Sequence, residues 1–147
     1  IVVPIIQRHG GVVNSFIGDG LFASFNLPLP LENHAAAAVR AALEIQQVLA
    51  SAEFAGGVKL NTRIGLNTGL VIGVTIGTEN RLSYTLLGDA VNVASRLEQL
   101  NKTFGTRILA AESTVLAAGA MDRSECLGES DVRGHKGNIM VYRIGPA

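Results

Sequence analysis

Hydrophobic and polar positions alternate along this chain with two periods, one typical of helices and one typical of strands. The longest helical pattern covers residues 32–49, where five apolar side chains recur every three or four positions and share one face: Ala35, Val39, Ala42, Ile45 and Leu49. A second helical pattern covers residues 89–100. We also expect the tail of an amphipathic helix at residues 1–8 and a short helix at residues 112–118.

Strand patterns occupy most of the remaining chain. Residues 12–17 and 21–25 are rich in β-forming side chains, and the Gly18-Asp19-Gly20 sequence between them is typical of a tight hairpin turn. Residues 59–67 alternate and lead into the apolar run 70–76, which predicts a buried hairpin. The rest of the pattern predicts a polar loop at 77–81, short strands at 83–87, 107–111 and 138–144, and a loop-rich segment at 119–137 with at most one strand.

Hairpins mixed with packed helices favour an α+β fold over a regular βαβ winding. A length of 147 residues suits one domain with a real core, so we expect residues 1–147 to form a single domain. The chain starts at Ile1 rather than at a methionine, and we expect this domain to be incomplete at its N-terminus.

Composition and charge narrow the classes of partner. Charged residues make up only 16% of the chain and apolar residues 48%, which predicts a buried partner interface or a missing piece of the domain. Twelve Lys and Arg balance twelve Asp and Glu, so we expect no nucleic-acid partner and no membrane contact from this segment. Cys126 is the only cysteine, which fits a reducing, cytoplasmic location. No apolar run approaches the roughly 20 residues of a membrane span, although a longer parent protein could still be membrane-tethered.

The helix predicted at residues 89–100 carries the first candidate chemistry. Asp89, Asn92 and Arg96 are spaced i, i+3 and i+7, so their side chains project from one stripe. An acceptor, an amide and a guanidinium in that order could grip the base edge, ribose and phosphate of a nucleotide. The alternative is a solvated helix face on which Asp89 acts only as an N-terminal charge.

Two further features bear on the same question. Asp19 lies between Gly18 and Gly20, where a metal ion or a phosphate could approach the backbone closely, although a plain polar turn needs no function. The basic segment 133–137, which includes Lys136, suits a triphosphate but could equally be a solvated surface loop. All three features occur in order on one α+β chain, which favours the functional interpretation.

Three segments resemble the class III adenylyl and guanylyl cyclases. Residues 16–23 (FIGDGLFA) resemble the metal-binding hairpin of that family, residues 63–69 (RIGLNTG) its glycine-rich strand and turn, and residues 84–98 (YTLLGDAVNVASRLE) its long signature. The resemblance implies a ferredoxin-like βαββαβ sandwich with a mostly antiparallel sheet and helices packed on it. It also implies a head-to-tail homodimer with active sites at the interface.

The same resemblance implies roles for individual residues. Asp19 matches one of two aspartates that hold two Mg²⁺ or Mn²⁺ ions, and Asp89 matches the residue that reads the base. Asn92 matches the amide that orients the ribose, and Arg96 matches the arginine that stabilises charge on the α-phosphate. Lys136 matches a lysine that binds the triphosphate.

Two positions depart from the family pattern, and one of them bears on the choice of base. The first metal aspartate of the family precedes the helix at residues 1–8, and this chain has no equivalent. Ser15 stands where adenylyl cyclases usually carry lysine and guanylyl cyclases glutamate, which leaves base choice largely to Asp89. An ionised Asp89 would accept from the adenine amino group but would meet guanine O6 as a second acceptor.

The sequence therefore predicts an adenylyl cyclase that converts ATP to 3′,5′-cyclic AMP and pyrophosphate, with catalysis at a dimer interface. Two alternatives stay open. One is a guanylyl cyclase, or a cyclase of relaxed specificity that also accepts GTP. The other is a catalytically degenerate domain that binds a nucleotide or a partner and regulates without turnover.

Overall fold

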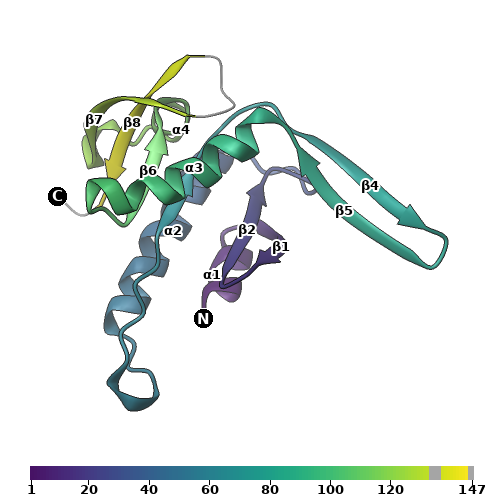
Figure 1. The fold of residues 1–147 in the computed structure, drawn as a ribbon, viewed down its shortest axis with the longest axis horizontal. Helices are drawn as coiled ribbons and strands as arrows, with labels where there is room; N and C mark the ends of the chain where they lie inside the picture. The colour runs from purple at the N-terminus through teal and green to yellow at the C-terminus, as the bar shows by residue number, and fades with distance from the viewer. Residues whose placement is uncertain (133–136, 146–147) are drawn as a thin grey trace.

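A computed structural model describes residues 1–132 and 137–145 of the chain. Helices and mainly antiparallel strands alternate along it, which confirms the predicted α+β fold class (Figure 1). The elements are α1 (Val2–Arg8), β1 (Gly11–Ile17), β2 (Gly20–Phe25), α2 (His34–Ser51), η1 (Ala55–Gly57), β3 (Ile64–Leu66), β4 (Ile72–Thr78), β5 (Arg81–Leu87), α3 (Asp89–Phe104), β6 (Ile108–Ala111), α4 (Glu112–Ala118), η2 (Met121–Arg123), β7 (Ser124–Asp131) and β8 (Asn138–Ile144).

The largest sheet has four strands in the order β3-β6-β8-β7. β3 runs parallel to β6, whereas β8 is antiparallel to both β6 and β7. β6 lies at the centre and is buried on both faces, because Ile108 and Ala110 pack toward α2 and α4 while Leu109 and Ala111 pack toward α3. The core therefore has helices on both sides of this sheet, and β6 accordingly has an uninterrupted apolar sequence.

A second cluster joins the N-terminal elements. Ile5 and Ile6 of α1 pack against Ile45 and Leu49 of α2, and the β1–β2 hairpin lies over the same cluster. The predicted apolar face of α2 is buried as expected, and the predicted hairpin forms with its two-residue turn at Gly18-Asp19. One face of the hairpin is thus held by apolar packing, while the turn residues at its tip are exposed.

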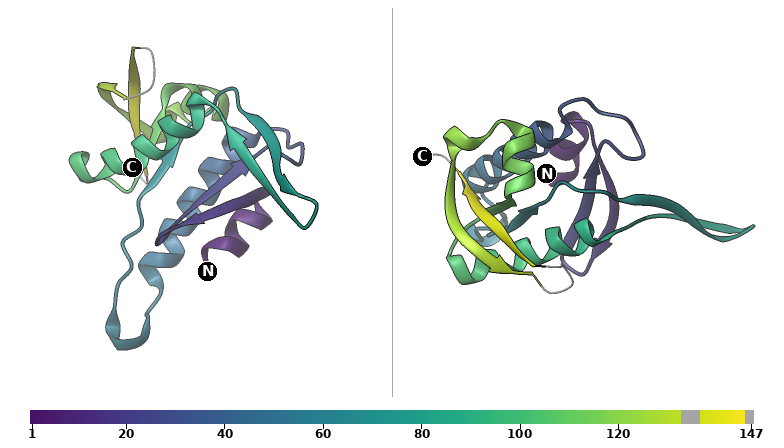
Figure 2. Two further views of the ribbon diagram at one scale, coloured as in Figure 1. Left: turned by 45° about the vertical axis from the view of Figure 1, so that its right-hand side comes forward. Right: turned by 90° about the horizontal axis from the view of Figure 1, so that it is seen from above.

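The prediction for residues 59–76 was wrong. Only β3 forms within 59–67, and it pairs with β6 rather than with β4. β4 instead forms an antiparallel arm with β5, and a two-residue turn at 79–80 replaces the predicted polar loop. The arm projects from the rest of the molecule (Figures 1 and 2), and its apolar side chains are exposed, Ile76 by 57% and Leu82 by 72%. An apolar run indicates burial only where something packs against it, and within the described residues nothing covers these side chains.

Two details of the remaining chain complete the architecture. The segment predicted to be loop-rich, residues 119–137, contains one long strand, β7, within the limit of one strand that the sequence allowed. β2 and β3 contribute side chains to the same N-terminal cluster, including Leu21 and Ile64, yet they belong to separate sheets. No helix among the described residues is long and apolar enough to cross a membrane.

Candidate active site

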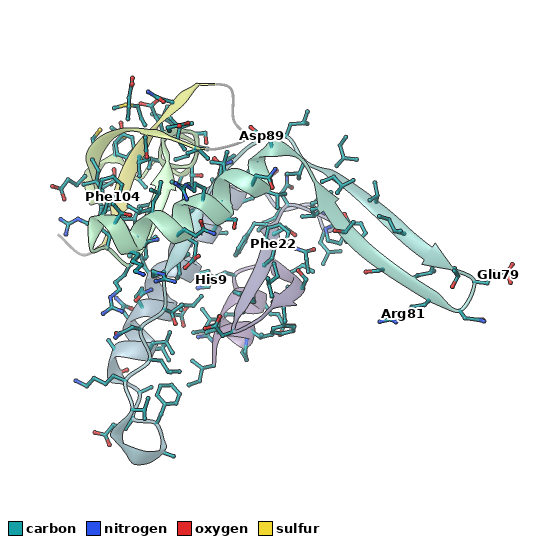
Figure 3. All side chains as sticks on the ribbon, viewed as in Figure 1. His9, Phe22, Glu79, Arg81, Asp89 and Phe104 are labelled. Carbon is teal, nitrogen blue, oxygen red and sulfur yellow. The ribbon has the colours of Figure 1, made fainter. Side chains whose placement is uncertain are left out.

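Helix α3 carries the predicted polar stripe. Its first residue is Asp89, and the helix continues to Phe104, where Gly105 ends it in the left-handed conformation. Figure 3 shows Asp89 at the end of α3 that meets the arm and Phe104 at the opposite end. Asn92 is exposed and Arg96 half-buried, whereas Val93, Leu97 and Leu100 pack into the sheet. The helix therefore presents its polar stripe away from the core, as the sequence predicts.

The backbone of α3 lies directly on β3. A side chain at Gly65 would fall on the carbonyl oxygen of Ala94 and the amide nitrogen of Glu98, closer than Cβ atoms approach backbone in real structures. Asn101 is 1% exposed, and its amide donates to the Ile64 carbonyl oxygen at 2.9 Å. Glycine permits this close approach, and the buried amide satisfies a strand carbonyl, so β3 fixes the position of α3.

Arg96 keeps much of its hydrogen-bonding capacity. One guanidinium nitrogen, Nη1, lies 3.3 Å from Oε1 of Gln99, whereas Nε is buried without a partner among the described residues. The neighbouring carboxylate of Glu98 is occupied by Arg63, whose Nε lies 2.7 Å from Glu98 Oε1. No carboxylate in the described part of the chain pairs with Arg96, so an anionic ligand would not compete with an internal ion pair for its guanidinium.

The tip of the β1–β2 hairpin presents Asp19. Gly18 has a φ of +59°, and no heavy atom lies within 4 Å of the position that a Cβ there would take. Phe16 and Ile17 just before it are 71% and 68% exposed. The carboxylate thus has open space around it, which suits a hard cation such as Mg²⁺ or Mn²⁺.

The described residues do not build a cage of several acidic ligands around a metal ion. Among residues 1–132 and 137–145, no group of three or more His, Cys, Asp and Glu side chains is placed to hold a metal ion. Mg²⁺ is usually held by one or two carboxylates together with substrate phosphates and waters, so Asp19 fits as one ligand of such a site.

The remaining predicted residues are dispersed. Ser15 is exposed on β1, opposite Phe22 of β2, and β1 contacts β5 of the arm. Lys136 lies outside the described residues. Asp89 lines a cavity of about 520 Å³, and neither Ser15 nor Asn92 contributes to its wall. Among the described residues, the cavity that Asp89 lines does not include Ser15.

The cavity beside Asp89 reveals one residue whose role the sequence did not indicate. Asn67 lines it together with Glu112 and Asn138. Its side-chain amide donates to the carbonyl oxygen of Ala90 in the first turn of α3, at 3.0 Å. Asn67 lies in the RIGLNTG segment, whose glycines predict a strand and a turn but whose asparagine has no local partner to indicate its role.

Comparison with known proteins agrees with this geometry. Residues 5–145 match the family model described as the adenylate and guanylate cyclase catalytic domain. Adenylate cyclase 1 of Rhizobium meliloti (strain 1021) is 36% identical over 144 residues, 95% of this chain and 22% of its own length. The terminal-differentiation specific adenylate cyclase of Dictyostelium discoideum is 42% identical over 120 residues, 80% of this chain and 6% of its own length.

Solved structures of cyclase catalytic domains also match this chain. The catalytic core of a rhodopsin-guanylyl cyclase with converted specificity, in complex with ATPαS, superposes with a TM-score of 0.83 and 29% identity. The match covers 99% of this chain and 77% of that one. The 147 residues span only about a fifth or less of the two curated relatives. On the family match and this superposition together, the chain belongs to the adenylate and guanylate cyclase catalytic domain family.

Proposed function

We propose that this chain is the catalytic domain of an adenylyl cyclase, which converts ATP to 3′,5′-cyclic AMP and pyrophosphate. The observation that carries the proposal is α3, which presents Asn92 and an Arg96 guanidinium without a carboxylate partner among the described residues. Both curated relatives described above are adenylate cyclases, which favours ATP over GTP. The converted guanylyl cyclase that binds ATPαS has the same fold, so the fold by itself does not set the base.

The proposed reaction is an in-line displacement at the α-phosphorus. The ribose 3′-oxygen loses its proton and forms a bond to the α-phosphorus, while the bond to the bridging oxygen breaks and pyrophosphate leaves. Asn92 orients the ribose, and Arg96 donates hydrogen bonds to the α-phosphate as charge develops on its oxygens. A preorganised group aimed at such charge is worth about 10² to 10³ in rate.

Divalent cations belong to this proposal as cofactors. Two Mg²⁺ or Mn²⁺ ions would lower the pKa of the 3′-hydroxyl and neutralise the phosphates. Asp19 contributes one carboxylate from the hairpin tip, and we propose that a carboxylate from another part of the assembly completes the site. The open space beside Gly18 lets the phosphates approach the hairpin backbone.

A homodimer would bring the two halves of the site together. The exposed apolar residues of the arm, Ile72, Ile76 and Leu82, form a surface typical of a protein interface. We place a second copy of the chain against this surface, with Asp19 of one protomer facing Asn92 and Arg96 of its partner. A two-fold axis then generates two identical sites.

We assign base choice mainly to Asp89, with Ser15 as a second position that modulates it. β1 contacts the arm strand β5, so the surroundings of Ser15 lie there, whereas Asp89 faces the cavity beside Asn67. Asp89 lines that cavity together with Asn67 and Asn138, polar side chains suited to a base edge, which supports the proposed base-reading role of Asp89.

Mixing two inactive variants tests the shared site. Asp19→Ala and Arg96→Ala are made in the longest natural polypeptide that contains these residues, and each homodimer is expected to be nearly inactive with ATP and Mn²⁺. A heterodimer contains one doubly damaged site and one intact site, so random pairing restores roughly a quarter of wild-type activity per chain. Restored activity should also rise with protein concentration where dimerisation is weak.

The alternatives give different results in the same assay. Cyclic GMP as the main product would identify a guanylyl cyclase. Nucleotide binding without any cyclic product would support a regulatory domain. Activity that fails to recover although the two variants exchange subunits would show that the residues do not act across a dimer.

A further inference from the structure

Asn67 connects the end of β3 to two helices through one side chain. Its Nδ2 donates to the Ala90 carbonyl oxygen at 3.0 Å, and its Oδ1 accepts from the Ser113 hydroxyl at 3.3 Å. Ala90 lies in the first turn of α3, and Ser113 is the second residue of α4. A single half-buried amide therefore fixes the starts of both helices relative to the central sheet.

Side-chain contacts along α3 differ between its start and its remaining turns. Its N-cap is Gly88, and no side chain caps the helix there. Farther along, the backbone contact at Gly65 and the buried amide of Asn101 hold the middle and the C-terminal half of the helix. At the N-terminal turn Asn67 holds the carbonyl of Ala90, two residues before Asn92. The segment that presents Asn92 thus lies between the Asn67 contact and the Gly65 contact.

We propose that Asn67 is a positioning residue for the reaction, which acts by fixing Asn92 through the first turn of α3. This inference rests on the proposed cyclase function. A misplacement of about 1 Å at a reacting group can cost on the order of 100-fold in rate. Loss of the Asn67 contact should therefore reduce kcat more than it changes KM, because both polar atoms of its amide are bonded to α3 and α4.

The variant Asn67→Asp isolates the contact to α3. Aspartate has nearly the same shape and can still accept from Ser113, but it places a carboxylate oxygen against the Ala90 carbonyl oxygen. In the longest natural polypeptide that contains these residues, we expect kcat with ATP to fall by about tenfold to a hundredfold. KM should stay within about twofold, because an interaction made only in the transition state is the one removed.

Two control variants change neighbouring contacts but leave the α3 contact intact. Ser113→Ala removes the bond to α4 from the same amide, and Thr68→Val removes the 2.9 Å hydroxyl pair with Thr114 of α4. Both should retain kcat within about twofold, while Thr68→Val lowers the melting temperature, since Thr114 is buried. Equal losses of kcat in Asn67→Asp and in these controls would overturn the proposal.

A double-mutant cycle separates positioning from general destabilisation. If Asn67 acts through Asn92, Asn67→Asp should cost less than about threefold in kcat in an Asn92→Ala background. Additive losses would overturn the proposal.

Hydrogen exchange supplies a readout that needs no turnover, because amides at residues 91–94 should exchange faster in Asn67→Asp than in Ser113→Ala. Unchanged exchange would show that the amide does not hold the helix. Absence of turnover in the unmodified protein would instead overturn the cyclase function itself.

Discussion

The two parts of the chain that carry the proposed active-site groups are held very differently. Helix α3 lies on β3 with backbone against backbone, and the amides of Asn67 and Asn101 hold it near its two ends. The β1–β2 hairpin packs on the N-terminal cluster by one face, and its tip with Asp19 is exposed. Asn92 and Arg96, which are proposed to contact the substrate and need accurate placement, lie on the firmly held helix α3. Asp19, which is proposed to bind the metal ions, lies on the exposed hairpin tip.

Because of this difference, substitutions in the two regions should affect activity and stability to different extents. A substitution at the hairpin tip removes few contacts, so its effect should appear in activity alone. A substitution in the contact between α3 and β3 should affect stability first, and activity through it. The predictions below test whether the two regions differ in this way, from the largest effect to the smallest.

Asp19→Asn at the exposed hairpin tip should reduce activity strongly and leave stability nearly unchanged. The change removes one negative charge and keeps the shape of the side chain, so we expect turnover to fall by about 10² to 10³. The free energy of unfolding should change by less than about 0.5 kcal/mol, because the side chain is exposed. Cyclic AMP formation and urea denaturation measure the two quantities. Near-normal turnover at saturating Mn²⁺ would show that Asp19 binds no metal ion and is only a turn residue.

Gly65→Ala in the contact between α3 and β3 should lower the stability of the protein. The new methyl group would meet the Ala94 carbonyl oxygen and the Glu98 amide nitrogen, and helix backbone cannot move aside as a flexible side chain can. We expect a loss of about 3 kcal/mol in the free energy of unfolding. Gly18→Ala in the hairpin serves as the comparison, since it meets no atom within 4 Å and carries only the strain of its positive φ. A smaller loss at Gly65 than at Gly18 would contradict the assigned anchoring.

Ser15→Lys should change specificity more than stability. An added ammonium can donate to adenine N1 but would confront the N1–H of guanine, so we expect the ratio of kcat/KM for ATP over GTP to rise about tenfold. The fold should tolerate the change, because Ser15 is exposed. Unchanged selectivity in an active protein would remove Ser15 from the base site.

Glu44→Gln should have the smallest effect, at the base of the hairpin. The carboxylate of Glu44 on α2 pairs with Arg8 and His9 at the end of α1, and these contacts join the two helices. The hydrogen bond to Arg8, followed by that to His9, holds the pKa of the Glu44 carboxyl below its usual range. Because the folded pKa is depressed, this contribution is present above the ordinary glutamate pKa and is lost as pH falls through the folded value. Glu44→Gln should therefore lower the melting temperature slightly at pH 7, and the difference should vanish in acid. A difference that persists in acid would show that packing, not charge, is lost.

Local patterns were sufficient for the elements that the active site uses. The apolar period of α2, the Gly18-Asp19 turn and the polar stripe of α3 all depend on residues a few positions apart, and the structure confirms each as an element. The roles of Asp19, Asn92 and Arg96 followed from motifs that are equally local, and they stay predictions until the variants are measured. Asn67 was overlooked because its partners, Ala90 and Ser113, are remote in sequence.

The sequence by itself thus determined the periodicity of most elements, the turn at Asp19 and the family to which the chain belongs. Only the tertiary structure decided that β3 pairs with β6, that β4 and β5 leave the core as an arm, and that Asn67 fixes the start of α3. The physical reason is that propensity and periodicity act over one or two turns of chain. Strand partners and burial depend instead on which distant segments come together, and an apolar run has the same sequence whether it faces a core or solvent.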